Sequence, residues 1–320
     1  MRRGTLDLLA CPSCRGGLRL KEEVIPDRGI GTGRLHCTGC DAEYPVERGV
    51  PRLIPSEAPV ERWDEWEEKQ QLGLQEYEAE ASDRNESFGD VAAEFGAFCA
   101  LTGTILDVGC GISASPPYAI LPPGSFYVGV DPLDSGVERE FEFVEGVGEQ
   151  LPFRNAVFDR VVAATSLDHF AAPVAVLAEI RRVMKPSGAL GIWIGVLDVG
   201  YFEKMYALPS LRDPEARRQV IESLRSGDLG HIAALAWRHG VANRSRSVLL
   251  RLRRLIRRPL PVAKVFEERA RYHFHFYSEP EIYELLRDCG FDVVRRRLVE
   301  DSVHGNSLFV IASPSQPGVG

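Results

Sequence analysis

Residues 104–111 read Thr-Ile-Leu-Asp-Val-Gly-Cys-Gly, a short apolar run that passes into a Gly-x-Gly turn. The β-branched and aliphatic residues predict a buried strand, and the glycines allow the backbone of the turn to approach a ligand closely. Residues 126–131 predict a second strand, which ends in the carboxylate of Asp131. An acid at this position can accept hydrogen bonds from two ribose hydroxyls. The two segments therefore predict an α/β fold that binds a nucleotide.

The turn nevertheless differs from the fingerprint of dinucleotide-binding proteins. Asp107 lies near the end of the predicted strand, before both glycines, and the third glycine of that fingerprint is missing. Further along the chain, the hydrophobic pattern predicts a strand over residues 157–164, a helix over 174–184 and a strand over 191–194. A Ser-x-x-Glu capping box at residues 278–281 opens a further helix, which Gly290 ends.

These segments resemble the class I S-adenosylmethionine-dependent methyltransferases, in particular the small-molecule, type 11-like family with the motifs ILDVGCG and VGVD. Matching motifs follow at residues 148–153, 157–162, 167–170 and 185–190. The resemblance covers about residues 103–196 and resumes near residues 272–312. It implies a doubly wound, Rossmann-like sheet of seven strands, the last of them antiparallel, and S-adenosylmethionine as the cofactor.

The resemblance also implies a role for each matching residue. The methionine part of the cofactor is expected beside Asp107, Gly109 and Gly111, and its ribose beside Asp131. The adenine is expected beside Gly148 and Glu149, and the sulfonium beside Ala164 and Thr165.

Three features depart from the family pattern. Ser113 replaces the third glycine, and Val147 aligns with the acid that often binds the adenine amino group. Prolines at 116–117 and 122–123 leave at most a turn or two of the helix that usually follows the glycines. These departures predict weaker cofactor binding or a reshaped pocket.

Four of the seven cysteines form two CxxC pairs separated by 22 residues. They are Cys11, Cys14, Cys37 and Cys40. Two such pairs complete a tetrahedral thiolate shell that suits Zn²⁺, whereas redox CxxC motifs typically stand singly before a helix. Glycines at 16, 17 and 39 predict tight turns whose amides point toward the sulfurs. The other cysteines, Cys99, Cys110 and Cys289, are predicted core residues.

Residues 5–55 resemble the short zinc-ribbon proteins that activate tRNA, rRNA and protein methyltransferases in trans. The tail at residues 44–55, Tyr-Pro-Val-Glu-Arg-Gly-Val-Pro-Arg-Leu-Ile-Pro, makes the resemblance more specific than the cysteines alone. It implies a zinc ribbon fused to the enzyme that it supports. A structural zinc site stabilises a segment too small to form its own core, so stability is the simplest role of the ribbon.

The composition, 44% hydrophobic and 26% charged, is that of a soluble globular protein and excludes collagen-like and disordered classes. No apolar run is long enough for a transmembrane helix or a signal peptide, so a cytoplasmic location is expected. The predicted parts are a zinc ribbon at 1–55, an acidic helical connector at 56–100, a cofactor-binding core at 101–197, a helical insertion at 198–272, the end of the core at 273–313 and a disordered tail at 314–320.

The net charge of −8 conceals two opposite windows. Residues 56–100 carry −10 and residues 241–272 carry +8. The acidic connector has a stripe of Trp63, Trp66, Gln70 and Tyr77, which more simply indicates packing than a substrate platform, and residues 82–87 predict a mobile joint. A lid over the active site is the sharper hypothesis for this connector.

The insertion is expected to act as a substrate cap, with an apolar pocket as one use of Tyr201, Phe202, Tyr206 and Trp237. Residues 246–258 predict a helix with one apolar face and a basic surface that includes Arg251, Arg253, Arg254, Arg257 and Arg258. Such a helix could bind an anionic membrane or RNA. We favour the simpler interpretation, in which it covers the core of the insertion and pairs with the acidic connector.

Transfer of a methyl group to a hydroxyl requires a base, and histidine suits this role at neutral pH. The candidates are His169 and His275, with Asp168 to orient His169 or contact the substrate. His273 ranks lower, because alternation along a strand would place it on the same face as His275, where one histidine supports the other.

These features predict a methyltransferase that acts on oxygen of a small-molecule or glycan-like acceptor. RNA methylation is an alternative, because zinc ribbons also occur in rRNA methyltransferases. The acidic connector and the lack of an Asn-Pro-Pro-Tyr-type signature weigh against it. A scaffold that retains a degenerate cofactor fold is a third possibility, motivated by Ser113, Val147 and the prolines. The acceptor and the oligomeric state do not follow from the sequence.

Overall fold

The computed structural model describes residues 1–24, 29–57, 59, 61, 63–196, 273–301 and 305–315, without the side chains of 22–28, 76–89 and 300–305. These residues belong to one compact unit, Met1–Leu197 with Arg271–Gly320. The predicted insertion at 198–272, its pocket residues, the basic helix at 246–258 and most of the tail lie outside the described residues.

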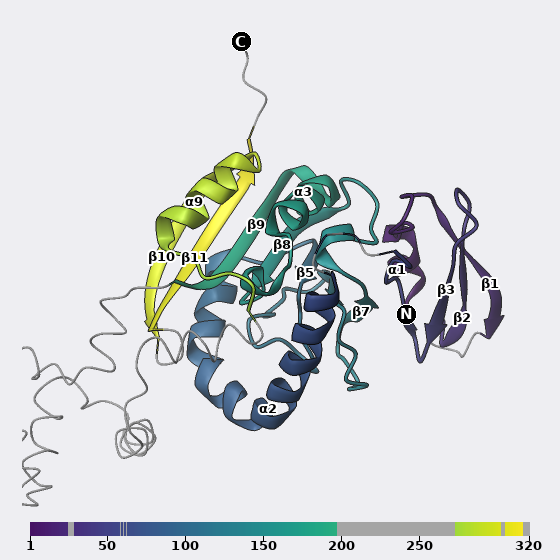
Figure 1. Ribbon diagram of the computed structural model, residues 1–320, viewed down its shortest axis with the longest axis horizontal. Coiled ribbons are helices and arrows are strands. Elements are labelled where there is room, and N and C mark those ends of the chain that lie inside the picture. The colour runs from purple at the N-terminus through teal and green to yellow at the C-terminus, as the bar shows by residue number, and fades with distance from the viewer. Residues whose placement is uncertain are drawn as a thin grey trace, which may run out of the picture. The chain divides into compact units, whose positions relative to one another are not determined.

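The N-terminal part forms a small antiparallel sheet (Figure 1). It begins with α1 (Arg3–Leu8) and continues with β1 (Leu18–Val24), β2 (Thr32–Cys37), β3 (Glu43–Glu47) and β4 (Val50–Pro51). Leu35 and Val46 alternate with exposed neighbours and lie in the core, as expected for a sheet with one buried face.

Within the described residues, seven strands form the main sheet in the order β10-β11-β9-β8-β5-β6-β7 (Figure 1). They are β5 (Thr104–Val108), β6 (Phe126–Asp131), β7 (Glu142–Glu145), β8 (Phe158–Ala164), β9 (Met184–Val196), β10 (Phe291–Asp301) and β11 (Gly305–Pro314). β5 to β9 are parallel, whereas β11 is antiparallel to both β9 and β10. The order confirms the predicted sheet with its antiparallel last strand.

Two hydrophobic clusters cover the two faces of this sheet. One face packs against α3 (Pro173–Val183) and α9 (Glu279–Asp288), and it includes Leu106 and Val108 of β5. The other face carries Ile105, which belongs to a cluster with Phe95 and Phe98 of α2 (Trp63–Cys99). Alternate residues of one strand thus serve opposite layers, which is the arrangement of a doubly wound α/β fold.

The long helix α2 corrects one expectation. Residues 82–87 were expected to form a joint, but the backbone is helical there, and Figure 1 shows α2 as a strongly curved helix. Residues 63–99 contain no proline, so no position lacks the amide that the helix needs. The predicted packing of the aromatic stripe holds for Trp66, which is buried and stacks on Trp63 with 4.1 Å between ring centroids.

The connections on the β5-β6-β7 side are irregular. Residues 112–125 contain no helix, as the prolines predict, and residues 132–141 contain none either. The capping box at Ser278 and Glu281 is present at the start of α9. None of the helices in the described part of the chain is long and apolar enough to cross a membrane.

Candidate functional site

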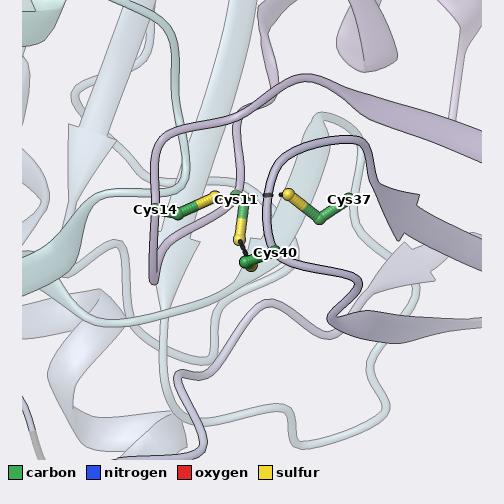
Figure 2. Close-up of side chains that lie close together, drawn as sticks. All are labelled: Cys11, Cys14, Cys37 and Cys40. Carbon is green, nitrogen blue, oxygen red and sulfur yellow. Dashed lines mark hydrogen bonds between the residues drawn. The ribbon is translucent and has the colours of Figure 1, made fainter.

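The four predicted metal-binding cysteines converge at one end of the small sheet (Figure 2). All four sulfur atoms lie within 4.8 Å of one another, with 3.7 Å between the Sγ atoms of Cys11 and Cys40 and 3.3 Å between those of Cys14 and Cys37. Thiolates bound tetrahedrally to zinc at about 2.3 Å are about 3.8 Å apart. The donor set and its spacing therefore fit Zn²⁺.

The surroundings of these sulfurs are built as the glycines predict. The amide of Gly16 donates to Sγ of Cys14 at 3.3 Å, and that of Gly39 donates to Sγ of Cys37 at 3.2 Å. A Cβ added at Gly16 would lie 3.0 Å from Sγ of Cys37. Such amide bonds orient the thiolates and stabilise their negative charge. The expected core positions of Cys99 and Cys110 are also confirmed, whereas Cys289 is only half-buried.

The ribbon attaches to the segment of the core that carries Gly148 and Glu149. At one end of this segment, Arg52 pairs with Glu145 in a parallel bridge and by an ion pair, and the amide of Leu53 donates to the Glu145 carbonyl at 2.7 Å. Three further contacts hold the other end: a bridge between Leu9 and Phe153, a bond from the Ala10 amide to the Pro152 carbonyl, and a bond from the Arg154 amide to the Leu8 carbonyl. The ribbon thus fixes residues 145–154 from both ends.

The two glycines of the predicted cofactor turn have different surroundings. Both have positive φ values, +77° at Gly109 and +69° at Gly111. A Cβ at Gly109 would lie 2.5 Å from Cβ of Ser166, whereas a Cβ at Gly111 would meet nothing within 4 Å. Gly109 is therefore required by internal packing, and the open space beside Gly111 fits the close approach of a ligand.

This difference predicts that alanine substitutions at the two glycines differ in their effects on stability and on cofactor binding. Gly109→Ala is expected to destabilise the fold by about 2–4 kcal/mol, because it adds an internal clash to the left-handed backbone strain. Gly111→Ala is expected to cost only about 1–2 kcal/mol of stability, while weakening S-adenosylmethionine binding about tenfold, or ~1.4 kcal/mol. Thermal unfolding and calorimetric titration measure both effects. Equal loss of stability in the two variants would contradict the assignment of Gly109 to internal packing and of Gly111 to the cofactor site.

Asp131 and Glu149 are both buried acids held by backbone amides. Asp131 accepts bonds from the amides of Gly111, at 2.8 Å, and Leu133, at 2.9 Å. Glu149 accepts bonds from Ala171 and Ala172 just before α3, and its second oxygen is buried without a hydrogen-bond partner among the described residues. Burial raises the pKa of both carboxyls, and the amide bonds oppose the shift. The positions fit acceptors for ribose hydroxyls and for a polar group of the adenine.

Asp107 is fully buried between two tyrosines. One carboxylate oxygen accepts bonds from the hydroxyls of Tyr127, at 2.6 Å, and Tyr118, at 2.7 Å. The other oxygen is buried without a partner among the described residues. Burial raises the pKa of Asp107 to about 7, against the opposing effect of the two hydroxyl bonds. The unbonded oxygen fits the amino group of the cofactor's methionine part.

This raised pKa predicts a pH dependence of cofactor binding. As the pH falls through about 7, Asp107 takes up a proton and loses the charge that attracts an ammonium group. S-adenosylmethionine affinity is therefore expected to fall about tenfold per pH unit between pH 7 and pH 5. Calorimetric titration over this range measures the slope. The Asp107→Asn variant is expected to bind weakly and with a shallower slope, and an unchanged slope in this variant would rule out Asp107 as its source.

Thr165 follows β8 with a φ of +53°, in the left-handed region that β-branched residues rarely occupy. Its amide donates to the Trp193 carbonyl at 2.7 Å, which holds this conformation. Strain of this kind is concentrated at functional sites. The expected place of Ala164 and Thr165 beside the sulfonium stays a prediction.

Next to this strained residue, Asp168, His169 and His273 form a cluster. Oδ2 of Asp168 lies 3.3 Å from Nε2 of His273, and Oδ1 lies 3.9 Å from Nε2 of His169. The two imidazole rings are 4.2 Å apart between centroids. Between Thr165 and this cluster, the hydroxyl of Ser166 donates to the Val108 carbonyl at the end of β5, at 2.7 Å. The cluster therefore follows a residue that contacts the strand end before the predicted cofactor turn.

The structure groups His273, rather than His275, with the two predicted residues of the 167–170 motif. Residues 273–276 do not form a strand, so the alternation that ranked His273 lower does not apply. Instead, the amides of Phe274 and His275 both donate to the Asp168 carbonyl, and Nζ of Lys69 donates to the His273 carbonyl at 3.1 Å. The ring of His275 stacks on Tyr277. No pattern in the sequence links Lys69 to this segment.

Two parts of the chain match known protein families. Residues 106–192 match a methyltransferase domain, and residues 2–49 match the Trm112p-like proteins. The two matched ranges coincide with the main sheet through β9 and with the small N-terminal sheet. They confirm the resemblances that the sequence motifs indicate.

Individual relatives share only part of the chain. Ubiquinone/menaquinone biosynthesis C-methyltransferase UbiE of Coxiella burnetii is 32% identical over 105 residues, which cover 29% of this chain and 42% of the relative. Sterol 24-C-methyltransferase of Pneumocystis carinii is 26% identical over 163 residues, covering 45% of this chain and 41% of the relative. The chain thus spans less than half the length of either relative.

Among solved structures, the chain is similar to 1,6-didemethyltoxoflavin-N1-methyltransferase of Burkholderia thailandensis, a structure with bound 1,6-didemethyltoxoflavin and S-adenosylhomocysteine. The TM-score is 0.47 and the identity 16%, and the match covers 90% of this chain and 100% of that chain.

Proposed function

We propose that this chain, which joins a methyltransferase domain to a Trm112p-like domain, is an S-adenosylmethionine-dependent methyltransferase. One observation carries the proposal. The cluster of Asp168, His169 and His273 lies just beyond β8 and the strained Thr165, after Ser166, whose hydroxyl donates to the Val108 carbonyl at the end of β5 at 2.7 Å. A cofactor turn and a proton-accepting cluster thus meet at the carboxyl ends of parallel strands, where α/β proteins bind ligands.

One group of residues holds the cofactor, and another group activates the acceptor. Asp107, Asp131 and Glu149 offer buried oxygens to the amino group, the ribose and the adenine, and Gly111 leaves room for close contact. S-adenosylmethionine supplies a methyl group on a sulfonium, whose carbon–sulfur bond breaks with its electron pair on sulfur. The cluster removes the proton of the acceptor, so that the acceptor's electron pair is available to form the new bond.

The acceptor in this proposal is a small molecule that carries a hydroxyl group, and the methyl group is placed on its oxygen. Methylation of carbon is the second candidate, because the two relatives named above are C-methyltransferases. Both reactions need the same preparation when the carbon is part of a phenolate or enolate, since ionisation of the hydroxyl makes the carbon nucleophilic. The cluster serves either acceptor.

Incubation of the full chain with S-adenosylmethionine labelled with ¹³C in its methyl group tests the proposal. Fractionated polar metabolites, lipid extracts and RNA serve as acceptors, and the carbon shift of the labelled product distinguishes oxygen from carbon as the methylated atom. Label in a hydroxyl-bearing small molecule is the expected result. Label found only in RNA would overturn the acceptor class, and no transfer to any fraction by a chain that binds the cofactor would overturn catalysis.

A further inference from the structure

We propose that Asp168, His169 and His273 form a binding site for a divalent transition-metal ion, separate from the zinc of the ribbon. Only the role of the ion rests on the proposed function: in methyl transfer, the ion would bind an oxygen of the acceptor as a further ligand. The site itself follows from the geometry of the three side chains.

The first observation is the convergence of three ligand types on one point. One ligand atom from each residue lies within 4.8 Å of the others, although His273 is more than a hundred residues from Asp168 in the chain. Ligands bound tetrahedrally at about 2.1 Å are about 3.4 Å apart. Nε2 of His273 lies 3.3 Å from Oδ2 of Asp168, which matches this value, and Nε2 of His169 lies 3.9 Å from the other oxygen, Oδ1. A small rotation of the carboxylate would bring one oxygen to both imidazoles.

The second observation is the orientation of the groups. Both histidines turn Nε2 toward the same carboxylate, whereas a base with an orienting acid needs only one imidazole. Oδ1 of Asp168 is buried and accepts no hydrogen bond from any residue that the structure describes. A buried carboxylate oxygen without a donor is costly, and a cation between the three side chains would satisfy it.

The third observation is that the backbone holds the cluster in place. The amides of Phe274 and His275 bind the carbonyl of Asp168, and Lys69 binds the carbonyl of His273. The three side chains are 13–18% exposed, so the cluster is open to solvent on one side. Two imidazoles and one carboxylate with open positions are a donor set suited to Fe²⁺, Co²⁺ or Zn²⁺.

An ion at this point would explain how the cluster acts on a hydroxyl. A bound cation lowers the pKa of an oxygen ligand by several units and fixes its position. The proton of the acceptor would then pass to water or buffer rather than remain on an imidazole. The histidines would be ligands, and their basicity would matter less than their geometry.

Titration of the zinc-loaded full chain with Co²⁺ tests the proposal. Calorimetry and visible absorption measure the binding of Co²⁺. The zinc content of the chain is measured first, and one equivalent of zinc is assigned to the ribbon. One further Co²⁺ per chain is expected, with binding weakened about 100-fold or more in Asp168→Asn and His273→Gln. His36→Gln is the matched control, because His36 also lies beside carboxylates, 3.6 Å from Asp41 and 3.5 Å from Glu43, but outside the cluster.

Failure of the wild-type chain to bind a second ion would overturn the proposal, as would equal binding by the cluster variants or loss of binding in His36→Gln. S-adenosylmethionine affinity, measured on the same samples, shows whether each variant is folded. Methyl transfer without a second ion would leave the proposed function intact and remove the metal site. Binding of a second ion without methyl transfer would support the metal site and overturn the proposed function.

Discussion

Cys37→Ser is expected to unfold the ribbon and to weaken cofactor binding in the adjoining core. Structural zinc contributes about 10–16 kcal/mol of binding free energy in small zinc domains, so loss of one thiolate removes much of the force that folds residues 2–53. The effect should extend to residues 145–154, because Arg52, Leu53 and Leu9 hold both ends of this segment. Glu149, in the middle, would then be held only by the amides of Ala171 and Ala172.

Hydrogen exchange followed by mass spectrometry measures this effect peptide by peptide. Faster exchange is expected first in residues 2–53, next in residues 145–154 and last in β5 and β8, together with weaker S-adenosylmethionine binding. Cys289→Ser is the control, because Cys289 is a half-buried cysteine outside the zinc cluster. Unchanged exchange and one full equivalent of zinc in Cys37→Ser would contradict the predicted site.

His273→Gln is expected to lower the rate of methyl transfer by about 10²–10⁴-fold, the range that proton transfer contributes in enzymes. Removal of one side chain from the cluster leaves the acceptor protonated, while the cofactor site around Asp131 and Gly111 is untouched. The rate constant at saturating cofactor should therefore fall without a change in S-adenosylmethionine affinity. Single-turnover kinetics with ¹³C-labelled cofactor and the acceptor found in the extract assay measure both quantities.

The corresponding His275→Gln variant decides between the two histidines of this segment. The sequence favours His275, and the structure groups His273 with Asp168 and His169. A larger rate loss in His273→Gln supports the cluster as described. A larger loss in His275→Gln would return catalysis to the residue that the sequence favours.

Much of the main sheet could be predicted because its signals are local. The Gly-x-Gly turn requires positive φ at Gly109 and Gly111, and the capping box at residues 278–281 marks the first turn of α9. Short apolar segments rich in β-branched residues are typical of strands that are buried on both faces of a sheet. These features depend on neighbouring residues alone, so the sequence is sufficient to find them.

The parts that could not be predicted depend on distant contacts. β7, with the residues Glu-Phe-Val-Glu, is too short to stand out, and it forms because β6 and the ribbon pair with its two edges. The place of His273 is set by amide bonds to the Asp168 carbonyl, not by a local period. The two tyrosines that bind Asp107 come from a loop and from the neighbouring strand. None of these contacts has a signature in the sequence around it.

Calorimetric titration of the full chain with S-adenosylmethionine measures whether the main sheet binds this cofactor. One cofactor per chain is expected, with affinity reduced by about 1.5–3 kcal/mol in Asp131→Ala, the usual worth of hydrogen bonds to a charged group. Glu138→Ala is the control, because Glu138 lies in the same connection after β6 but is exposed. No binding by the wild-type chain would show that the main sheet is not a site for this cofactor, and equal binding by Asp131→Ala would show that Asp131 does not hold its ribose.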